Sequence, residues 1–269
     1  MPILPLPSSS LRRALSLAAL AALLATAAPA VATRAVPGCG REGTPSCLPV
    51  TDHGPSRVPR VSGNGRYVTF DTFHDLTNDG KGGLYRLDLL TGATDRVNVD
   101  DDGERNDRYS VVTAISGDGD RVLFSAAAPH SSLSAPFQLY VREFSTGRTV
   151  LASANTAGGP TEGWMSPWAV ISADGRFVAF AAQGGDLVAG DRPTGYVTEV
   201  YLRDLTLGTT ARVSYGQGGL GQNTNTNAGI PRVSAGGRYV GFTAIAGLIP
   251  EDTDNSQDVY VRDMQTGQL

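Results

Sequence analysis

The sequence is poor in the side chains from which most catalytic and metal sites are built. It holds three histidines, two cysteines and a single lysine among 269 residues. The histidines, His53, His74 and His130, fall in different loop-like segments, and no Gly-x-Ser-x-Gly motif accompanies them. A serine hydrolase needs a nucleophile, a base and an orienting acid in mutual contact. The sequence therefore argues against such a site, and we predict no catalytic residue in this chain.

Basic charge and long apolar runs are also lacking. The formal net charge is −4, whereas binding to a nucleic-acid backbone requires a basic surface. The apolar segment Leu15–Ala28, made only of Leu, Ala, Ser and Thr, has 14 residues, fewer than the ~20 that a membrane helix needs. Beyond this run, no segment shows a 3.6-residue apolar period. We therefore expect no nucleic-acid partner, no membrane span after signal cleavage, and an all-β mature protein.

The first 32 residues have the composition of a signal peptide. Arg12-Arg13 precedes the run Leu15–Ala28, and Ala30-Val31-Ala32 places small residues at the spacing of a cleavage site. We expect cleavage after Ala32, with Ala30 as the alternative. The protein is then secreted or held in the cell envelope, and the paired arginines leave general secretory and twin-arginine export both open.

Both cysteines lie in the leader that follows, residues 33–57. Seven residues rich in glycine and proline separate Cys39 from Cys47, so the loop between them is able to close. Because exported proteins meet an oxidising compartment, we predict a Cys39–Cys47 disulfide, with two free thiols as the alternative. A metal site here is disfavoured, since only His53 lies near enough in the sequence to add a third ligand.

Four copies of one sequence motif, which we call the first phrase, dominate the rest of the chain. Each runs Ser-x-x-Gly-x-x-Val-x-Phe or a close variant, and each is followed by a second phrase, Tyr-x-x-acid. The first phrase occupies Ser62–Phe70, Ser116–Phe124, Ser172–Phe180 and Ser234–Phe242, and the second occupies Tyr85–Asp88, Tyr140–Glu143, Tyr201–Asp204 and Tyr260–Asp263. Successive Phe residues are 54, 56 and 62 positions apart, which is typical of a four-stranded propeller blade with long loops.

The phrases predict the strands of each blade. A strand leads to the first Ser, a Gly-containing hairpin leads into the second strand, the Tyr phrase forms the third, and a Thr-Gly or Leu-Gly turn leads into the fourth. We expect an all-β propeller domain over residues 58–269, with blades at about 58–99, 111–153, 168–215 and 230–269. The last blade has three strands. A partial propeller is favoured, and a four-bladed ring closed by Leu48–Thr51 is the alternative.

The two phrases resemble the repeat of TolB-type β-propellers, a WD-like group of exported bacterial proteins, over about Val58–Leu269. The resemblance implies an interaction scaffold, a sensor part, or a companion domain of peptidases and carbohydrate lyases. We expect an exported, non-catalytic binding module for a protein, a peptide or an envelope glycan. The alternative is a partial propeller enzyme, a lyase or glycosidase acting on polysaccharide. In a partial propeller the open blade ends expose Val240 and Phe242 or Val68 and Phe70, which favours self-association.

The long second-to-third-strand loops and the links between blades open on one face, so we expect the ligand there. Trp164 is a candidate for stacking on a ligand, whereas burial against the next blade is favoured for Trp168. Polar side chains at a channel mouth add further binding candidates: Asn223, Asn225 and Asn227. The acids of the Tyr phrase recur in every copy, which indicates a role in the blade's own hydrogen bonding rather than in one site.

One loop has the spacing of a cation site. Asp252, Asp254 and Asp258, with Asn255, place hard oxygen ligands within seven residues, and Ca²⁺ accepts such ligands. The loop lacks the central Gly and terminal Glu of an EF-hand. A solvated turn whose carboxylates cap local backbone groups is the favoured interpretation, and weak Ca²⁺ binding at these three residues is the alternative. No other cofactor is predicted.

Overall fold

A computed structural model describes residues 56–269, apart from residues 74, 78–81, 101–109, 128–135, 184, 191–196, 217–227, 246 and 255. The chain divides into two units, Met1–Asp52 and His53–Leu269, and the described residues belong to the second. The signal peptide, both cysteines, the closing strand Leu48–Thr51 and the three asparagine candidates lie outside the described residues, so these stay predictions. No described helix is long and apolar enough to cross a membrane.

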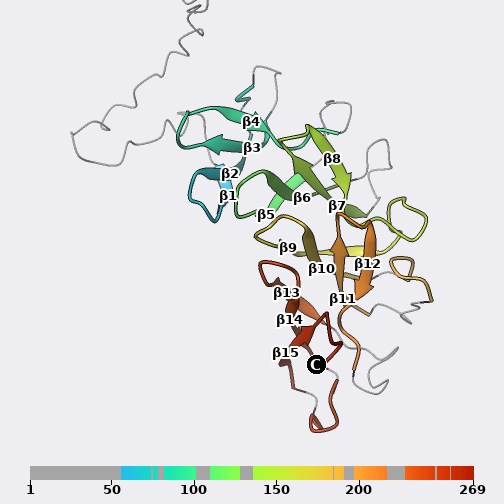
Figure 1. The fold of residues 1–269 in the computed structure, drawn as a ribbon. Coiled ribbons are helices and arrows are strands. Elements are labelled where there is room, and N and C mark those ends of the chain that lie inside the picture. Colours follow the sequence, from blue (N-terminus) through green and yellow to red (C-terminus); the bar gives the residue numbers. More distant parts are fainter. Residues whose placement is uncertain are drawn as a thin grey trace, which may run out of the picture. The chain divides into compact units, whose positions relative to one another are not determined.

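The described residues form four antiparallel sheets, in agreement with the predicted all-β propeller (Figure 1). Three sheets have four strands in the order of the chain, and the fourth sheet has three. The strands are β1 Ser56–Val61, β2 Tyr67–Thr72, β3 Gly83–Asp88, β4 Thr94–Arg96, β5 Ser110–Ile115, β6 Arg121–Ala127, β7 Phe137–Glu143, β8 Arg148–Leu151, β9 Trp164–Ile171, β10 Phe177–Gln183, β11 Glu199–Asp204, β12 Thr209–Arg212, β13 Gly229–Val233, β14 Tyr239–Ala244 and β15 Asp258–Asp263.

Repeated contacts explain why both phrases recur. The Phe of the first phrase stands opposite the Tyr of the second, as Phe180 and Tyr201 do with ring centroids 5.8 Å apart. The Arg of the first phrase pairs with the acid of the second, as Arg176 does with Asp204 at 2.6 Å. All four blades contain this ion pair: Arg66–Asp88, Arg121–Glu143, Arg176–Asp204 and Arg238–Asp263. The predicted role of the recurring acids within the blade is confirmed.

The ion pair also shifts the ionisation of its acid. A hydrogen bond from Arg238 is the main cause that lowers the pKa of Asp263 to about 2. In the third blade a hydrogen bond from Arg176 likewise lowers the pKa of Asp204. These carboxylates are therefore charged at neutral pH, where a charge-assisted hydrogen bond to arginine is strongest.

Hairpin glycines let consecutive blades approach closely. Gly119 has a φ of 81°, which L side chains rarely adopt, and a Cβ there would lie 2.1 Å from the Tyr67 ring of the preceding blade. Backbone hydrogen bonds join the same turns from blade to blade, from Asn64 N to Gly117 O and from Gly117 N to Ala173 O, both at 2.8 Å. The repeated glycine therefore serves the contact between blades as well as the turn.

Each blade buries one apolar face against the next blade along the chain. Leu123 and Leu139 of the second blade pack with Val178 and Phe180 of the third. The same positions of the third and fourth blades form the next cluster, which contains Ala179, Val200, Val240 and Phe242. Among the described strands, those of the first and fourth sheets form no interface of this extent. The described contacts support the partial propeller rather than the closed ring.

One detail of the predicted blade ends is wrong. Val240 and Phe242 are buried, at 0% and 1% exposure, because they face the third blade. The open face of the last blade instead carries Tyr239, Val259 and Val261, which are 44%, 76% and 53% exposed. Residues two apart along a strand share a face, but the strand pattern alone does not say which face meets a neighbour.

Candidate functional site

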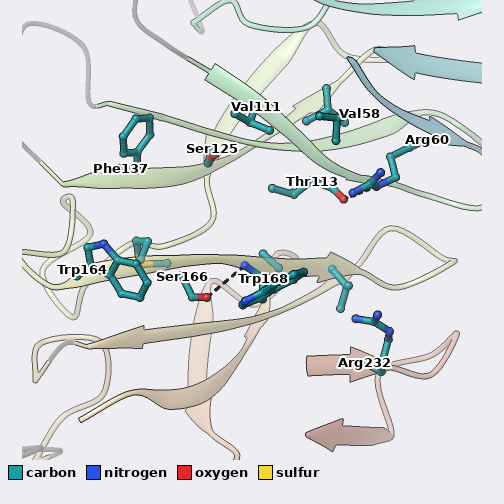
Figure 2. Close-up of a pocket in the computed structure, with 14 residues that line it drawn as sticks. Val58, Arg60, Val111, Thr113, Ser125, Phe137, Trp164, Ser166, Trp168 and Arg232 are labelled. Carbon is teal, nitrogen blue, oxygen red and sulfur yellow. Dashed lines mark hydrogen bonds between the residues drawn. The ribbon is translucent and has the colours of Figure 1, made fainter. Parts of the chain in front are cut away.

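The first strands of the four sheets line one pocket of about 660 Å³. Arg60 comes from β1, Thr113 from β5, Trp168 from β9 and Arg232 from β13 (Figure 2). Valine, methionine and aromatic side chains make up most of the remaining wall. Its lining draws residues from all four blades, and its size suits a ligand pocket.

Irregular backbone on the first strands shapes this wall. Strand pairing shifts between Arg57 and Arg60 in the first blade and between Gly229 and Arg232 in the fourth. A bulge of this kind bends the strand and re-aims the side chains next to it. The irregularities therefore turn residues out of the regular alternation and towards the pocket.

Three aromatic side chains line the pocket while remaining accessible. Trp164 is 52% exposed, Trp168 is 56% exposed and Phe137 is 38% exposed. Burial of large aromatic rings is strongly favourable, so leaving three of them accessible in one concavity indicates a surface that a ligand covers. Trp164, which the sequence made a candidate for stacking on a ligand, lies in this wall.

The interpretation of Trp168 as a buried core residue is wrong. On β10, Phe180 pairs with Ala169 and Ala182 pairs with Met165, so three residues of β9 oppose the single residue Ala181. Within this bulge, Trp168 N donates to Ser166 Oγ at 3.3 Å (Figure 2). The bulge places the Trp168 ring in the pocket. The sequence held a signal for it in Pro167, because a proline within a strand is confined to an edge strand or a bulge.

Two pocket arginines were missed by the sequence interpretation. Arg60 Nε donates to Thr113 O at 3.0 Å and Arg60 Nη1 donates to Pro59 O at 3.0 Å. Arg232 Nη1 donates to Pro231 O at 2.9 Å. A usable signal was present, because the first and fourth repeats share Pro-Arg-Val-Ser ahead of the first phrase, at Pro59–Ser62 and Pro231–Ser234.

The structure brings the three aspartates of the candidate cation loop together. Single carboxylate oxygens of Asp252, Asp254 and Asp258 all lie within 4.8 Å of one another. Two of them also serve the loop itself, since Tyr260 Oη donates to Asp252 and Ser256 N donates to Asp254 Oδ1 at 2.7 Å. Burial, and then the Asp252 hydrogen bond, raise the pKa of Tyr260 to about 12. The hydroxyl therefore stays protonated and continues to donate.

We predict that this loop binds Ca²⁺ weakly, with a dissociation constant of about 10⁻⁴–10⁻³ M, because exposed carboxylates already used as caps form no rigid cage. Calorimetric titration of the mature protein with Ca²⁺ measures this directly, and an Asp254→Asn variant serves as the control. A submicromolar constant that the variant loses would show instead a dedicated calcium site.

Comparisons with known proteins find likeness at the level of structure alone. Neither protein-family models nor curated protein sequences match this chain. The crystal structure of the tricorn protease aligns with a TM-score of 0.50 and 15% identity over 78% of this chain. The β-propeller domain of the Trilobed protease from Pyrococcus furiosus aligns at 0.45 and 13% over 77%, and a protein described as TolB from Agrobacterium tumefaciens aligns at 0.39 and 16% over 80%.

The likeness to the tricorn protease concerns the fold alone. The chain spans 18% of the tricorn protease chain, 53% of the Trilobed protease chain and 79% of the TolB chain. At identities this low, one fold serves many unrelated functions. The function of this chain therefore has to be argued from its own pocket.

Proposed function

We propose that this chain is an exported binding module, without catalysis of its own, that holds a segment of a peptide or protein in the pocket between its first strands. The observation that carries the proposal is the set of three accessible aromatic rings, Trp164, Trp168 and Phe137, in one pocket of about 660 Å³. Aromatic anchors in a concavity are the usual source of binding energy in protein recognition. Export follows from the signal-like N-terminus.

The composition of the wall favours peptide over glycan. Apolar side chains such as Val58, Val112 and Met165 line the same pocket as the aromatic rings. A sugar presents hydroxyls on most of its edges, and each hydroxyl that loses water needs a new hydrogen-bond partner. Apolar peptide side chains need none. A glycosidase site would instead be built around two carboxylates, one on each side of the scissile bond. The lining of this pocket is mostly apolar and aromatic.

Intrinsic fluorescence tests the proposal directly. The sequence contains two tryptophans, and both line the pocket, so their emission reports on this site. We expect a capped apolar peptide, acetyl-Phe-Leu-Ala-Ala amide, to change the emission saturably, and a Trp168→Ala variant to weaken binding by about tenfold.

The matched control is Leu207→Ala, because Leu207 is also exposed, at 66%, but lies in a hairpin turn away from the pocket. It should bind the peptide like the unchanged protein. Oligogalacturonate and cello-oligosaccharides form the glycan arm of the titration. Saturable emission changes with glycans, and none with the peptide, would contradict the proposal and support the polysaccharide-directed alternative.

A further inference from the structure

Two arginines line the pocket without forming an ion pair with a described carboxylate. Seven described arginines form ion pairs with carboxylates: Arg66, Arg86, Arg96, Arg121, Arg176, Arg212 and Arg238. Arg60 and Arg232, by contrast, donate to backbone carbonyls, and no described carboxylate pairs with either. Both are exposed in the pocket that they line. Their positive charge is therefore available to a ligand.

The same unusual backbone presents both arginines. Val58 has a φ of 51° and Ile230 has a φ of 47°, and among the described residues these are the only two other than glycine with a positive φ. A β-branched residue in this region is a genuine outlier, and such strain gathers where function requires it. Each stands two residues before its arginine, directly ahead of the shared Pro-Arg-Val-Ser segment. The second and third blades have Ala114 and Val170 at the arginine position.

The pocket has an aromatic end and a cationic end. Figure 2 shows Trp164 and Phe137 towards one end, and Arg60 and Arg232 towards the other. The register of β10 measures the distance between the two ends. Gln183 of β10 pairs with Trp164, at the aromatic end, and Ala179 pairs with Val170, which has the place in the third blade that Arg60 and Arg232 have in theirs. Gln183 and Ala179 are four residues apart, which corresponds to roughly 14 Å along the strand. An extended peptide of about four residues covers such a distance.

We infer that the pocket binds a peptide segment with a carboxylate about three residues beyond an aromatic or apolar side chain. This inference rests on the proposed function. The carboxylate accepts hydrogen bonds from Arg60 and Arg232, whose planar guanidinium groups suit carboxylates, and the aromatic side chain packs between Trp164 and Phe137. The carboxylate comes from a chain terminus or from an acidic side chain, and both sources offer the same chemistry.

Three acetylated peptides distinguish a terminal carboxylate, no carboxylate and an acidic side chain: Phe-Ala-Ala-Ala with a free C-terminus, the same peptide as its amide, and Phe-Ala-Ala-Asp amide. Each peptide is titrated against the full chain, and tryptophan fluorescence reports binding. A peptide with a carboxylate at the right distance should bind about tenfold more tightly than the peptide amide. Tighter binding of the first peptide than of the third identifies a terminal carboxylate, and the reverse identifies an acidic side chain. Either order supports the inference.

Arg60→Gln and Arg232→Gln should each remove most of this preference, and circular dichroism checks that each variant remains folded. Arg148→Gln, an exposed arginine of β8 outside the pocket lining, is the matched control and should keep the preference. Equal affinity of the unchanged protein for all three peptides overturns the inference and leaves the proposed function standing. Absence of binding by all three overturns both.

A second, independent observation concerns the open face of the fourth blade. Val259 is 76% exposed, although the same strand position is buried in the other blades, at Leu84, Leu139 and Val200, with exposures of 1% or less. Val261 is 53% exposed, whereas Val141 and Leu202 are 2% and 5% exposed at its position. In those blades these positions are covered by the following blade.

The complementary face is present on the first blade. Val68 and Phe70 are half-buried, whereas Phe124, Phe180 and Phe242 at the Phe70 position are 0–1% exposed against the preceding blade. We propose that the fourth blade of one copy packs on the first blade of a second copy and repeats the interface that already joins blades within the chain. Such a contact is head-to-tail, and it extends to rings or filaments.

Light scattering after size exclusion tests this proposal on the mature protein. Mass should rise with concentration, and Val261→Arg and Phe70→Arg should each give monomers. An equimolar mixture of these two variants should give a dimer and nothing larger, because each retains one of the two faces. Leu207→Arg, which alters an exposed turn residue, should associate like the unchanged protein. A monomer at every concentration, or a mixture that stays monomeric, overturns the proposal.

Discussion

Replacing Arg212 by leucine should lower the free energy of unfolding by about 3–5 kcal/mol, because it leaves a buried carboxylate without its cation. Glu199 is 0% exposed, and its carboxylate accepts hydrogen bonds from Arg212 Nη2 at 2.7 Å and from Ser214 Oγ. Urea unfolding of the full chain, followed by circular dichroism, measures the change.

The second blade supplies the matched control for this experiment. Gln138 occupies the position of Glu199 and Leu151 that of Arg212, since Leu151 stands opposite Tyr140 as Arg212 stands opposite Tyr201. There the neutral Gln138 accepts a hydrogen bond from Ser153 Oγ at 2.8 Å. The double variant Glu199→Gln/Arg212→Leu copies that arrangement and should regain most of the lost stability. A double variant as unstable as Arg212→Leu would show that the lost packing of the arginine stem, rather than the unpaired charge, causes the loss of unfolding free energy.

Phe180→Ala should cost about 3–5 kcal/mol of unfolding free energy, which is the usual penalty for truncating a fully buried aromatic residue. Phe180 is 0% exposed, stacks on Tyr201 and belongs to the core between the second and third blades. The same urea titration measures the loss.

Phe70→Ala is the matched comparison, because Phe70 has the same place in the first blade and faces the same type of tyrosine, with centroids 6.1 Å apart. It is only half-buried, so its truncation should cost clearly less than that of Phe180. Equal losses would show that Phe70 is covered as fully as its equivalents, and this result would also count against the open first-blade face.

Local sequence determined the parts of the fold that repeat. A hairpin glycine followed by a short apolar run suffices to place strands such as Phe177–Gln183, because turn geometry and strand propensity act over a few residues. The role of Asp204 in the hydrogen bonding of its blade was also indicated, because an acid recurs at that position in all four copies. What recurs in every copy has to serve every blade, and this reasoning needs no coordinates.

The pocket and the faces between blades were decided by tertiary structure. Arg60 and Arg232 are 172 positions apart in the sequence, and they line one pocket because the first strands of four blades converge there. Trp168 lies in that pocket because of a bulge against Ala181. The alternation of residues on a strand states which side chains share a face. Which face meets another blade, and which stays open to a ligand, depends on packing between segments far apart in the chain.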